Sequence, residues 1–343
     1  PPRRLEKSKY RGIMKITIAR LRSGINYKGP LDHVVDSFCE LYKEFINKHP
    51  ENFYGYYNFG FNKAHRRKLD DIIDSDVILI PSENEFLSHI DKYLDPIYKN
   101  KTFEAVDKII PYLKDKHIII LRSDRADTEE LYRTRTFKNQ PIGKFSIIDE
   151  IDIPGGIHAM KYHFIQNEIF AKLFKTEKEY DFVYWGCDKK KLIDNVKSGD
   201  TRHIVLRQVQ KDKKLKSFFI GHYSTVKRDH KIDTMKNILP FLEKSKYTMC
   251  FNWIDPKATT SRYHEALACG IIPMVWQDTY DVDKLLVKDD WQRVYSVEEL
   301  YDKINSTNYE KKYNEIHDTY NKTLLSENEI YSNFEQILLD KLS

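Results

Sequence analysis

The feature of this sequence that most constrains its fold is an alternation of short apolar runs with amphipathic stretches along the chain. The strand-like runs are residues 14–19, 77–80, 117–121, 145–148, 181–184, 217–220, 248–253 and 271–275. Apolar residues recur at helical spacing in residues 31–45, 86–98, 204–209, 235–242 and 261–269. Short buried strands that alternate with helices predict an α/β protein with parallel sheets and right-handed crossovers.

The strand–helix series restarts after the polar stretch 172–179, which indicates two doubly wound domains. The 343 residues are also long for a single hydrophobic core. We predict an N-terminal Rossmann-like domain over residues 13–170, a C-terminal one over 180–320, and a final helical segment, 320–343, that crosses back to the first domain. Ligands bind at the carboxyl ends of the strands in such folds, so the domains are expected to face a central cleft.

Composition excludes some classes of protein and leaves others open. No run approaches the ~18 apolar residues that span a bilayer, and no signal-peptide pattern opens the sequence. The four cysteines are scattered, without a close pair for zinc, which favours a reducing compartment. We therefore expect a cytoplasmic protein with no membrane partner. The formal charge of +5 suits an anionic substrate, but a mixed-charge surface gives the same sum.

The most informative segment is 260–273, TSRYHEALACGIIP, in which a helix is followed at once by a strand. Arg262 and Glu265 share one face of the first helical turn, where backbone N–H groups favour an anion. A guanidinium there can grip a diphosphate bidentately, and a carboxylate one turn on can accept from both ribose hydroxyls. An ordinary capped helix with an Arg–Glu pair explains the spacing equally well. The small residues Ala266 and Gly270 favour the binding interpretation, because they let the helix lie close under a ligand.

The pattern R-x-x-E-A-x-A-x-G-x-x-P in this segment resembles the donor-binding helix of GT-B glycosyltransferases. Within that superfamily, the chain most resembles the T-even bacteriophage DNA glucosyltransferases. The similarity extends to the strand DFVYWG (181–186), to Ser198 and Gly199 followed by Arg202, and to the strand end FFIG (218–221). It covers most of the second domain, whereas only strand ends align in the first.

The resemblance implies a GT-B fold of two Rossmann-like domains. It also implies transfer of a sugar from a uridine-diphosphate donor to 5-hydroxymethylcytosine in duplex DNA, in the cytoplasm of an infected bacterium. The enzyme must then flip the base out of the stack, and a monomer is expected. The residues that the resemblance assigns to the donor are Gly186, Cys187, Lys189, Arg202, Gly221, Ile232, Arg262 and Glu265. Lys189, Lys190 and Lys191 stand where the family places a phosphate-binding arginine, and Ile232 is assigned to the uracil.

No tightly bound cofactor and no structural metal site are expected. Asp74 and Asp76 resemble the D-x-D pair of metal-dependent GT-A enzymes, but they precede a strand where those enzymes place the pair after one. Asp281 and Asp283 have no other metal ligand near them in the sequence. A divalent cation, Mg²⁺ or Mn²⁺, that assists departure of the diphosphate would suit the chemistry.

An inverting transfer needs a general base that takes the proton of the acceptor hydroxyl. Asp124 follows the strand-like run 117–121, and the β-type phage enzyme has an aspartate after the corresponding strand. A surface Asp–Arg pair also explains Asp124. Asp32 and His33, at the start of the first long helix, are the rival candidates, and a helix N-cap explains Asp32 equally well. The identity of the sugar (glucose, arabinose or another) and the anomeric outcome stay open, since the α-type phage enzymes share the architecture.

Two basic clusters in the first half predict salt-sensitive contacts with DNA phosphates. Their arginines are Arg66, Arg67, Arg122, Arg125, Arg133 and Arg135. Two other functions stay open. The chain could be a GT-B transferase for a cell-surface glycan or lipid-linked acceptor, although the amphipathic membrane face that is usual there is not clear in this sequence. It could also be a nucleotide-sugar- or DNA-binding protein without catalysis.

Overall fold

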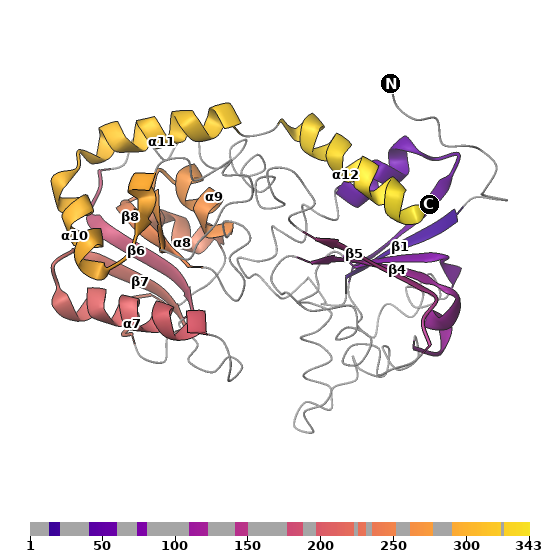
Figure 1. Ribbon diagram of the computed structural model, residues 1–343, viewed down its shortest axis with the longest axis horizontal. Helices are drawn as coiled ribbons and strands as arrows, with labels where there is room; N and C mark the ends of the chain where they lie inside the picture. The colour runs from indigo at the N-terminus through magenta and orange to yellow at the C-terminus, as the bar shows by residue number, and fades with distance from the viewer. Residues whose placement is uncertain are drawn as a thin grey trace. The chain divides into compact units, whose positions relative to one another are not determined.

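A computed structural model describes residues 14–20, 41–59, 74–80, 110–122, 141–149, 177–187, 197–222, 226–230, 235–251, 261–276, 290–323 and 326–343. These residues form α/β structure in two compact units (Figure 1). The first unit holds the first five strands and the residues from Phe334 to the end of the chain. The second holds the other five strands and the helices that accompany them.

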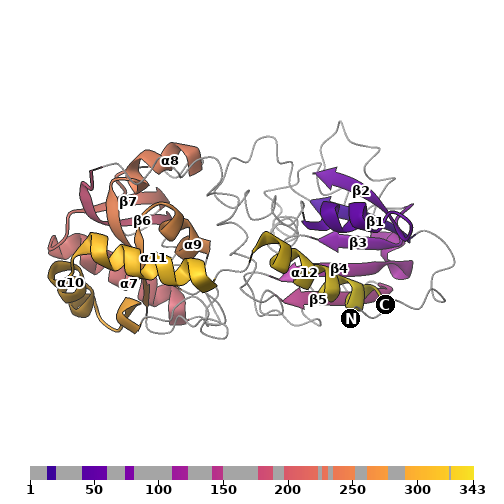
Figure 2. The same ribbon diagram turned by 90° about the horizontal axis from the view of Figure 1, so that it is seen from above.

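The first unit is built on a five-stranded parallel sheet whose order is β2-β1-β3-β4-β5 (Figure 2). Its strands are β1 (Met14–Arg20), β2 (Phe53–Phe59), β3 (Val77–Ile80), β4 (His117–Arg122) and β5 (Lys144–Asp149), and a 3₁₀ helix, η3 (Ile110–Asp115), precedes β4. All four residues of β3 and residues 118–121 of β4 are buried. Continuous burial of β-branched residues is typical of a parallel strand that is covered on both faces.

Strand β2 is the element of the first sheet that the apolar pattern does not predict. Its sequence, FYGYYNF, contains no aliphatic residue, yet it pairs in parallel with all seven residues of β1. Aromatic side chains favour strands as strongly as β-branched ones do. The five tyrosine and phenylalanine residues are therefore the signal that indicates this strand, although they form no aliphatic run.

The pair Asp74 and Asp76 has a structural role at the amino end of the first sheet. The Asp74 carboxylate accepts from Lys15 Nζ at 2.7 Å, and Asp76 Oδ2 accepts from the backbone N–H of Lys15 at 2.8 Å. Between them, the hydroxyl of Ser75 is hydrogen-bonded to that of Thr17, and both residues are buried. The two aspartates thus join the start of β3 to β1.

The second unit repeats the winding of the first. Its strands are β6 (Tyr180–Cys187), β7 (Ser217–His222), β8 (Ser245–Cys250), β9 (Ile272–Trp276) and β10 (Arg293–Val294), all parallel, in the order β10-β9-β8-β6-β7. In each sheet the chain's first strand pairs with its second on one side and its third on the other. This order is that of a doubly wound α/β sheet, in which the direction of winding reverses beside the first strand.

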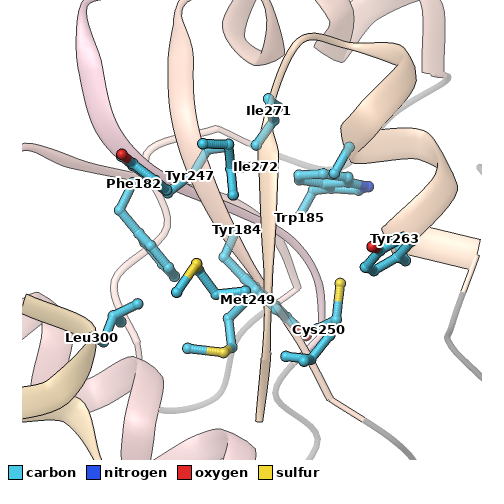
Figure 3. Close-up of a cluster of buried hydrophobic side chains, with 14 of the residues drawn as sticks. Phe182, Tyr184, Trp185, Tyr247, Met249, Cys250, Tyr263, Ile271, Ile272 and Leu300 are labelled. Carbon is cyan, nitrogen blue, oxygen red and sulfur yellow. The ribbon is translucent and has the colours of Figure 1, made fainter. Parts of the chain in front are cut away.

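Helices cover both faces of the second sheet. Phe241 of α8 (Met235–Leu242) stacks on Phe218, and α9 (Ser261–Ala268) contacts Trp185 on that same face. On the other face, Arg202 of α7 (Lys197–Asp212) lies over the Phe251 ring. Figure 3 shows Leu300 of α10 (Val297–Ser306) beside Phe182 and Met249, whereas Trp185 lies next to the helix that carries Tyr263. The expected α/β class with parallel sheets is therefore observed.

The chain ends in two helices, α11 (Tyr309–Thr323) and α12 (Glu327–Leu342). In the described part of the chain, no helix is both long enough and apolar enough to cross a membrane. From Phe334 onward α12 belongs to the first unit, where the fully buried Phe334 packs edge-on against Tyr42 with ring centroids 5.1 Å apart. The carboxylate of Glu335, the next residue, accepts a hydrogen bond from Nε2 of His49 at 2.5 Å.

Candidate functional site

The carboxyl edge of the second sheet concentrates the groups that can recognise a charged ligand. All strands of this sheet are parallel, so their carboxyl ends lie along one edge. The reversal of winding lies between β6 and β8, and α7 and α9 follow these two strands in the chain. Their N-termini, which carry a partial positive charge, therefore start from this edge.

The sequence of α9 explains both its position and its length. Tyr263, Ala266, Leu267 and Ala268 are fully buried, because the helix packs on the sheet. It ends in a Schellman motif: Gly270 has φ 68°, its N–H donates to Leu267 O, and the N–H of Ile271 donates to Ala266 O at 2.8 Å. Strand β9 starts two residues after Gly270, as the helix–glycine–strand pattern predicts.

Arg262 lies across the end of β6. Its Nη2 donates to the backbone carbonyl of Trp185 at 2.5 Å, and its Cζ lies 4.4 Å from the ring centroid of Tyr184. Gly186, at φ 138°, makes this course possible, because a Cβ atom there would stand 2.6 Å from Arg262 Nη2. The guanidinium is thus held by a carbonyl and by an aromatic face at the same point of the strand.

Glu265 takes its partner from the same strand. Its Oε2 accepts from the indole Nε1 of Trp185 at 2.9 Å, and both side chains are almost completely buried. A buried carboxylate is costly unless hydrogen bonds satisfy it. The N–H of Trp185 supplies one such bond, and it fixes the orientation of the carboxyl group within the edge of the sheet.

A row of aromatic rings extends the site across three neighbouring strands. Tyr184 meets Phe251 edge-on at 6.1 Å, and Phe251 meets Trp276 at the same distance. Arg202 lies over Phe251 with its Cζ 5.7 Å from the ring centroid, as Arg262 lies over Tyr184. Two guanidinium groups from different helices are therefore held on adjoining rings of one aromatic row.

Helix α11 holds α9 from the side away from the sheet (Figures 1 and 2). The hydroxyl of Tyr313 donates to Leu267 O at 2.6 Å, and that of Tyr309 donates to Gly270 O. The hydroxyl of Tyr320 is bonded to Nδ1 of the buried His264 at 2.5 Å. Three tyrosines at near-helical spacing thus satisfy polar groups of α9 and fix its rotation, which sets where Arg262 and Glu265 point.

Lys178 secures the opposite, amino end of this layer. Its Nζ donates to Glu243 O at 2.8 Å and to Gly270 O at 3.0 Å, the carbonyls that follow α8 and α9. Helix C-termini attract a cation, but burial lowers the pKa of Lys178 to about 8. The lysine ties the two helices together, far along the sheet from the site.

The structure brings together part of the predicted donor set. Gly186 pairs in register with Gly221 of β7, and Arg262 and Glu265 meet β6 at Trp185 and Gly186. Arg202 joins them through the aromatic row. Tyr184, Trp185 and Phe251 also belong to this site. No role was predicted for them, although Tyr184 and Trp185 lie in the strand motif DFVYWG (181–186).

The other predicted residues fall into two groups. Cys187 and Arg122 are the last residues of the strands β6 and β4. The residues that lie outside the described ranges are Asp32, His33, Arg66, Arg67, Asp124, Arg125, Arg133, Arg135, Lys189 and Ile232. Among the residues that are described, no three His, Cys, Asp or Glu side chains are grouped so that they could hold a metal ion. Cys250 and Cys269 are buried free thiols.

Two guanidinium groups, two helix N-termini and one buried carboxylate thus line a single sheet edge. Arginine forks on a rigid support recognise phosphate oxygens bidentately. A carboxylate beside them accepts hydrogen bonds from hydroxyl groups. The arrangement suits a ligand that carries a polyanionic group next to a hydroxylated one.

Comparison with known proteins identifies the fold. No protein-family model matches the chain, and no curated protein matches its sequence significantly. The structure resembles that of a DNA-modifying β-glucosyltransferase solved in the presence and absence of uridine diphosphoglucose. The TM-score is 0.61 and the identity 14%, over 94% of this chain and 99% of that one. It also resembles a T4 phage β-glucosyltransferase, with a TM-score of 0.57, 16% identity and the same two coverages. The predicted GT-B type of α/β fold and the predicted likeness to phage DNA glucosyltransferases are confirmed at the level of the fold.

Proposed function

We propose that this protein is a glycosyltransferase that moves a sugar from a uridine-diphosphate donor to the hydroxyl of 5-hydroxymethylcytosine, or of a related hydroxymethylated base, in duplex DNA. The observation that carries the proposal is the pair Arg262 and Glu265, both bound to Trp185 at the carboxyl edge of the second sheet. Further support comes from the two β-glucosyltransferases with this fold, one of which modifies DNA and has uridine diphosphoglucose as a substrate.

In this proposal the diphosphate lies between the two arginines. Arg262 and Arg202 neutralise it as the bond between sugar and phosphate breaks, which stabilises the charge that develops on the leaving group. Glu265 accepts hydrogen bonds from the ribose hydroxyls. Gly186 and Cys187 bring the main chain close to the phosphates, and the remaining members of the donor set are Lys189, Gly221 and Ile232.

The acceptor belongs to the first unit in this proposal. Asp124, two residues beyond the end of β4, takes the proton of the base's hydroxymethyl group as its oxygen attacks the anomeric carbon, with inversion. DNA phosphates are bound by the basic clusters, whose arginines are Arg66, Arg67, Arg122, Arg125, Arg133 and Arg135. The target base leaves the stack to reach the donor. The protein acts as a monomer in the cytoplasm of an infected bacterium.

The test is a transfer assay with labelled UDP-sugars and two duplexes that differ only in hydroxymethylation of cytosine. We expect label to enter the hydroxymethylated duplex alone, and Glu265→Ala to weaken donor binding. Parallel reactions with Mg²⁺, Mn²⁺ or a chelator measure whether a divalent cation assists. Transfer to a glycan or lipid-linked acceptor instead of DNA would show that the proposed acceptor is wrong. Binding of the donor without transfer to any acceptor would show that the protein binds nucleotide sugars but is not a transferase.

The Asp124→Asn variant tests the proposed base. The amide has nearly the shape of the carboxylate but cannot take a proton, so turnover should fall by about 10²-fold or more. Donor affinity, measured by calorimetry with UDP, should stay unchanged. If turnover persists, the base is to be sought at Asp32 or His33, and the variants Asp32→Asn and His33→Gln distinguish these two.

A further inference from the structure

One residue of β6 contacts both members of the proposed ligand pair. The backbone carbonyl of Trp185 accepts from Arg262 Nη2 at 2.5 Å, and its indole Nε1 donates to Glu265 Oε2 at 2.9 Å. Arg262 and Glu265 lie on one helical turn, and Trp185 lies on the strand beneath it. Both charged groups are therefore tied to the same residue of the sheet.

The side-chain contact is more specific than core packing requires. Trp185 has an exposed fraction of 2% and Glu265 one of 3%. A phenylalanine or leucine could fill the same space, but it would not donate a hydrogen bond to the carboxylate of Glu265. Since Trp185 is rigidly packed in a strand between β7 and β8, its N–H is a donor with a fixed direction.

The fixed N–H limits how a ligand can use the carboxylate. It occupies one acceptor position of Oε2 and holds the plane of the carboxyl group. Hydroxyl groups of a ligand must therefore approach the carboxyl group in the plane that this hydrogen bond fixes. Two hydroxyls on adjacent carbons, such as the 2′- and 3′-hydroxyls of ribose, can both donate to one carboxylate in a defined plane, whereas 2′-deoxyribose offers one donor fewer.

We propose that Trp185 is the positioning residue that makes this site select a ribonucleotide over a 2′-deoxyribonucleotide. Through its indole N–H, it holds Glu265 in the orientation that accepts from the ribose hydroxyls. For an enzyme that works beside DNA, this selection keeps deoxynucleotides out of the donor site. The inference rests on the proposed function and extends it to the residue that sets the specificity.

The experiment compares the affinity of UDP and of 2′-deoxy-UDP for the whole protein by calorimetry. The wild type should bind UDP at least about tenfold more tightly, since one hydrogen bond to a charged group is lost with the 2′-hydroxyl. Trp185→Phe removes the donor and keeps an aromatic ring. It should weaken the binding of UDP by about tenfold and that of 2′-deoxy-UDP much less, so that the preference for UDP disappears. In turnover assays KM for the donor should rise, while kcat at saturating donor changes little.

Two further variants separate positioning from packing. Replacement of Trp185 by β-(3-benzothienyl)alanine puts sulfur in place of the N–H at nearly unchanged shape, and it should also abolish the preference even if Trp185→Phe is unstable. Tyr263→Phe is the matched control. It removes a buried hydroxyl of the same helix, 3.2 Å from Gln292 Oε1, and should leave the preference intact.

The outcomes distinguish this inference from the proposed function. If the wild type prefers UDP and both Trp185 variants keep the same preference, the role of Trp185 is wrong and the donor site stands. If the variants weaken both nucleotides equally, Trp185 only supports packing, and the inference is again wrong. If the wild type binds neither nucleotide, the proposed function itself fails, and the inference fails with it.

Discussion

At the scale of single residues, the site depends on the absence of a Cβ atom at Gly186. Arg262 reaches from α9 to the face of Tyr184 through the space that a side chain at position 186 would fill. The hydrogen bond to the carbonyl of Trp185 then fixes the guanidinium. Gly186 therefore makes room for the arginine directly.

Gly186→Ala tests this dependence. The new Cβ would stand 2.6 Å from Arg262 Nη2, at a φ of 138° that alanine rarely adopts, so the arginine should be displaced. Loss of the charge-assisted contact between Arg262 and the diphosphate should lower the affinity for UDP by about tenfold to a hundredfold, as measured by calorimetry. Gly143→Ala is the contrast, because its Cβ would meet Lys116 O at 2.5 Å in the first unit. That variant should lower the melting temperature and leave UDP affinity unchanged; equal affinities for all three proteins would contradict the prediction.

At the scale of elements, the two units are completed by helices from distant parts of the sequence. The site helix α9 is fixed by α11, whose tyrosines bind its carbonyls and its histidine. The first unit receives the last residues of α12, with Phe334 packed on Tyr42. Both helices lie after the second sheet in the chain, yet they support different parts of the molecule.

Phe334→Ala should destabilise the first unit selectively. Removal of a fully buried ring leaves a cavity that costs about 3–5 kcal/mol. Urea unfolding should show an early transition, while UDP still binds to the second unit at low denaturant. Ser332→Ala, at an exposed position of the same helix, is the control and should unfold like the wild type. Loss of UDP binding in step with the early transition would show that the two units do not unfold separately.

The elements also show what sequence reasoning can reach. Val77–Ile80 and Met235–Leu242 have the predicted bounds, because aliphatic runs and helical spacing are local signals. Strand β2 was missed, since its residues are aromatic, and β8 begins three residues before the predicted start. The Arg262–Glu265 spacing could be interpreted within one helical turn. The partner of Glu265 could not, because Trp185 is 80 positions away and only the packing of α9 on β6 brings the two together.

At the scale of the whole molecule, a half-buried histidine makes stability depend on pH. His117 begins β4 and its Nε2 is 2.8 Å from Ser146 Oγ. Burial, together with the charge of Lys144, lowers the pKa of His117 from 6.5 to about 4. Between these two values the unfolded chain binds a proton that the native protein does not, so stability is lost as the pH falls from 6.5 towards 4.

Urea unfolding at several pH values between 7 and 4 measures this effect. The wild type should lose about 1 kcal/mol more stability over that interval than His117→Gln, a magnitude reduced for solvent screening of a half-buried group. The glutamine keeps a hydrogen-bonding side chain beside Ser146 but does not titrate. Parallel stability curves for the two proteins would show that His117 is protonated equally in the folded and unfolded states.

The return of the chain to its first unit has a consequence for biosynthesis. The residues Phe334–Ser343 leave the ribosome long after β5, so the first sheet must wait for them. At usual elongation rates the delay is roughly 10–40 s, during which the second unit can already fold. The nascent first unit must therefore stay incomplete, with the surface that will receive Phe334 uncovered, until these residues have been made. A stalled or prematurely released chain would expose that surface to chaperones and proteases.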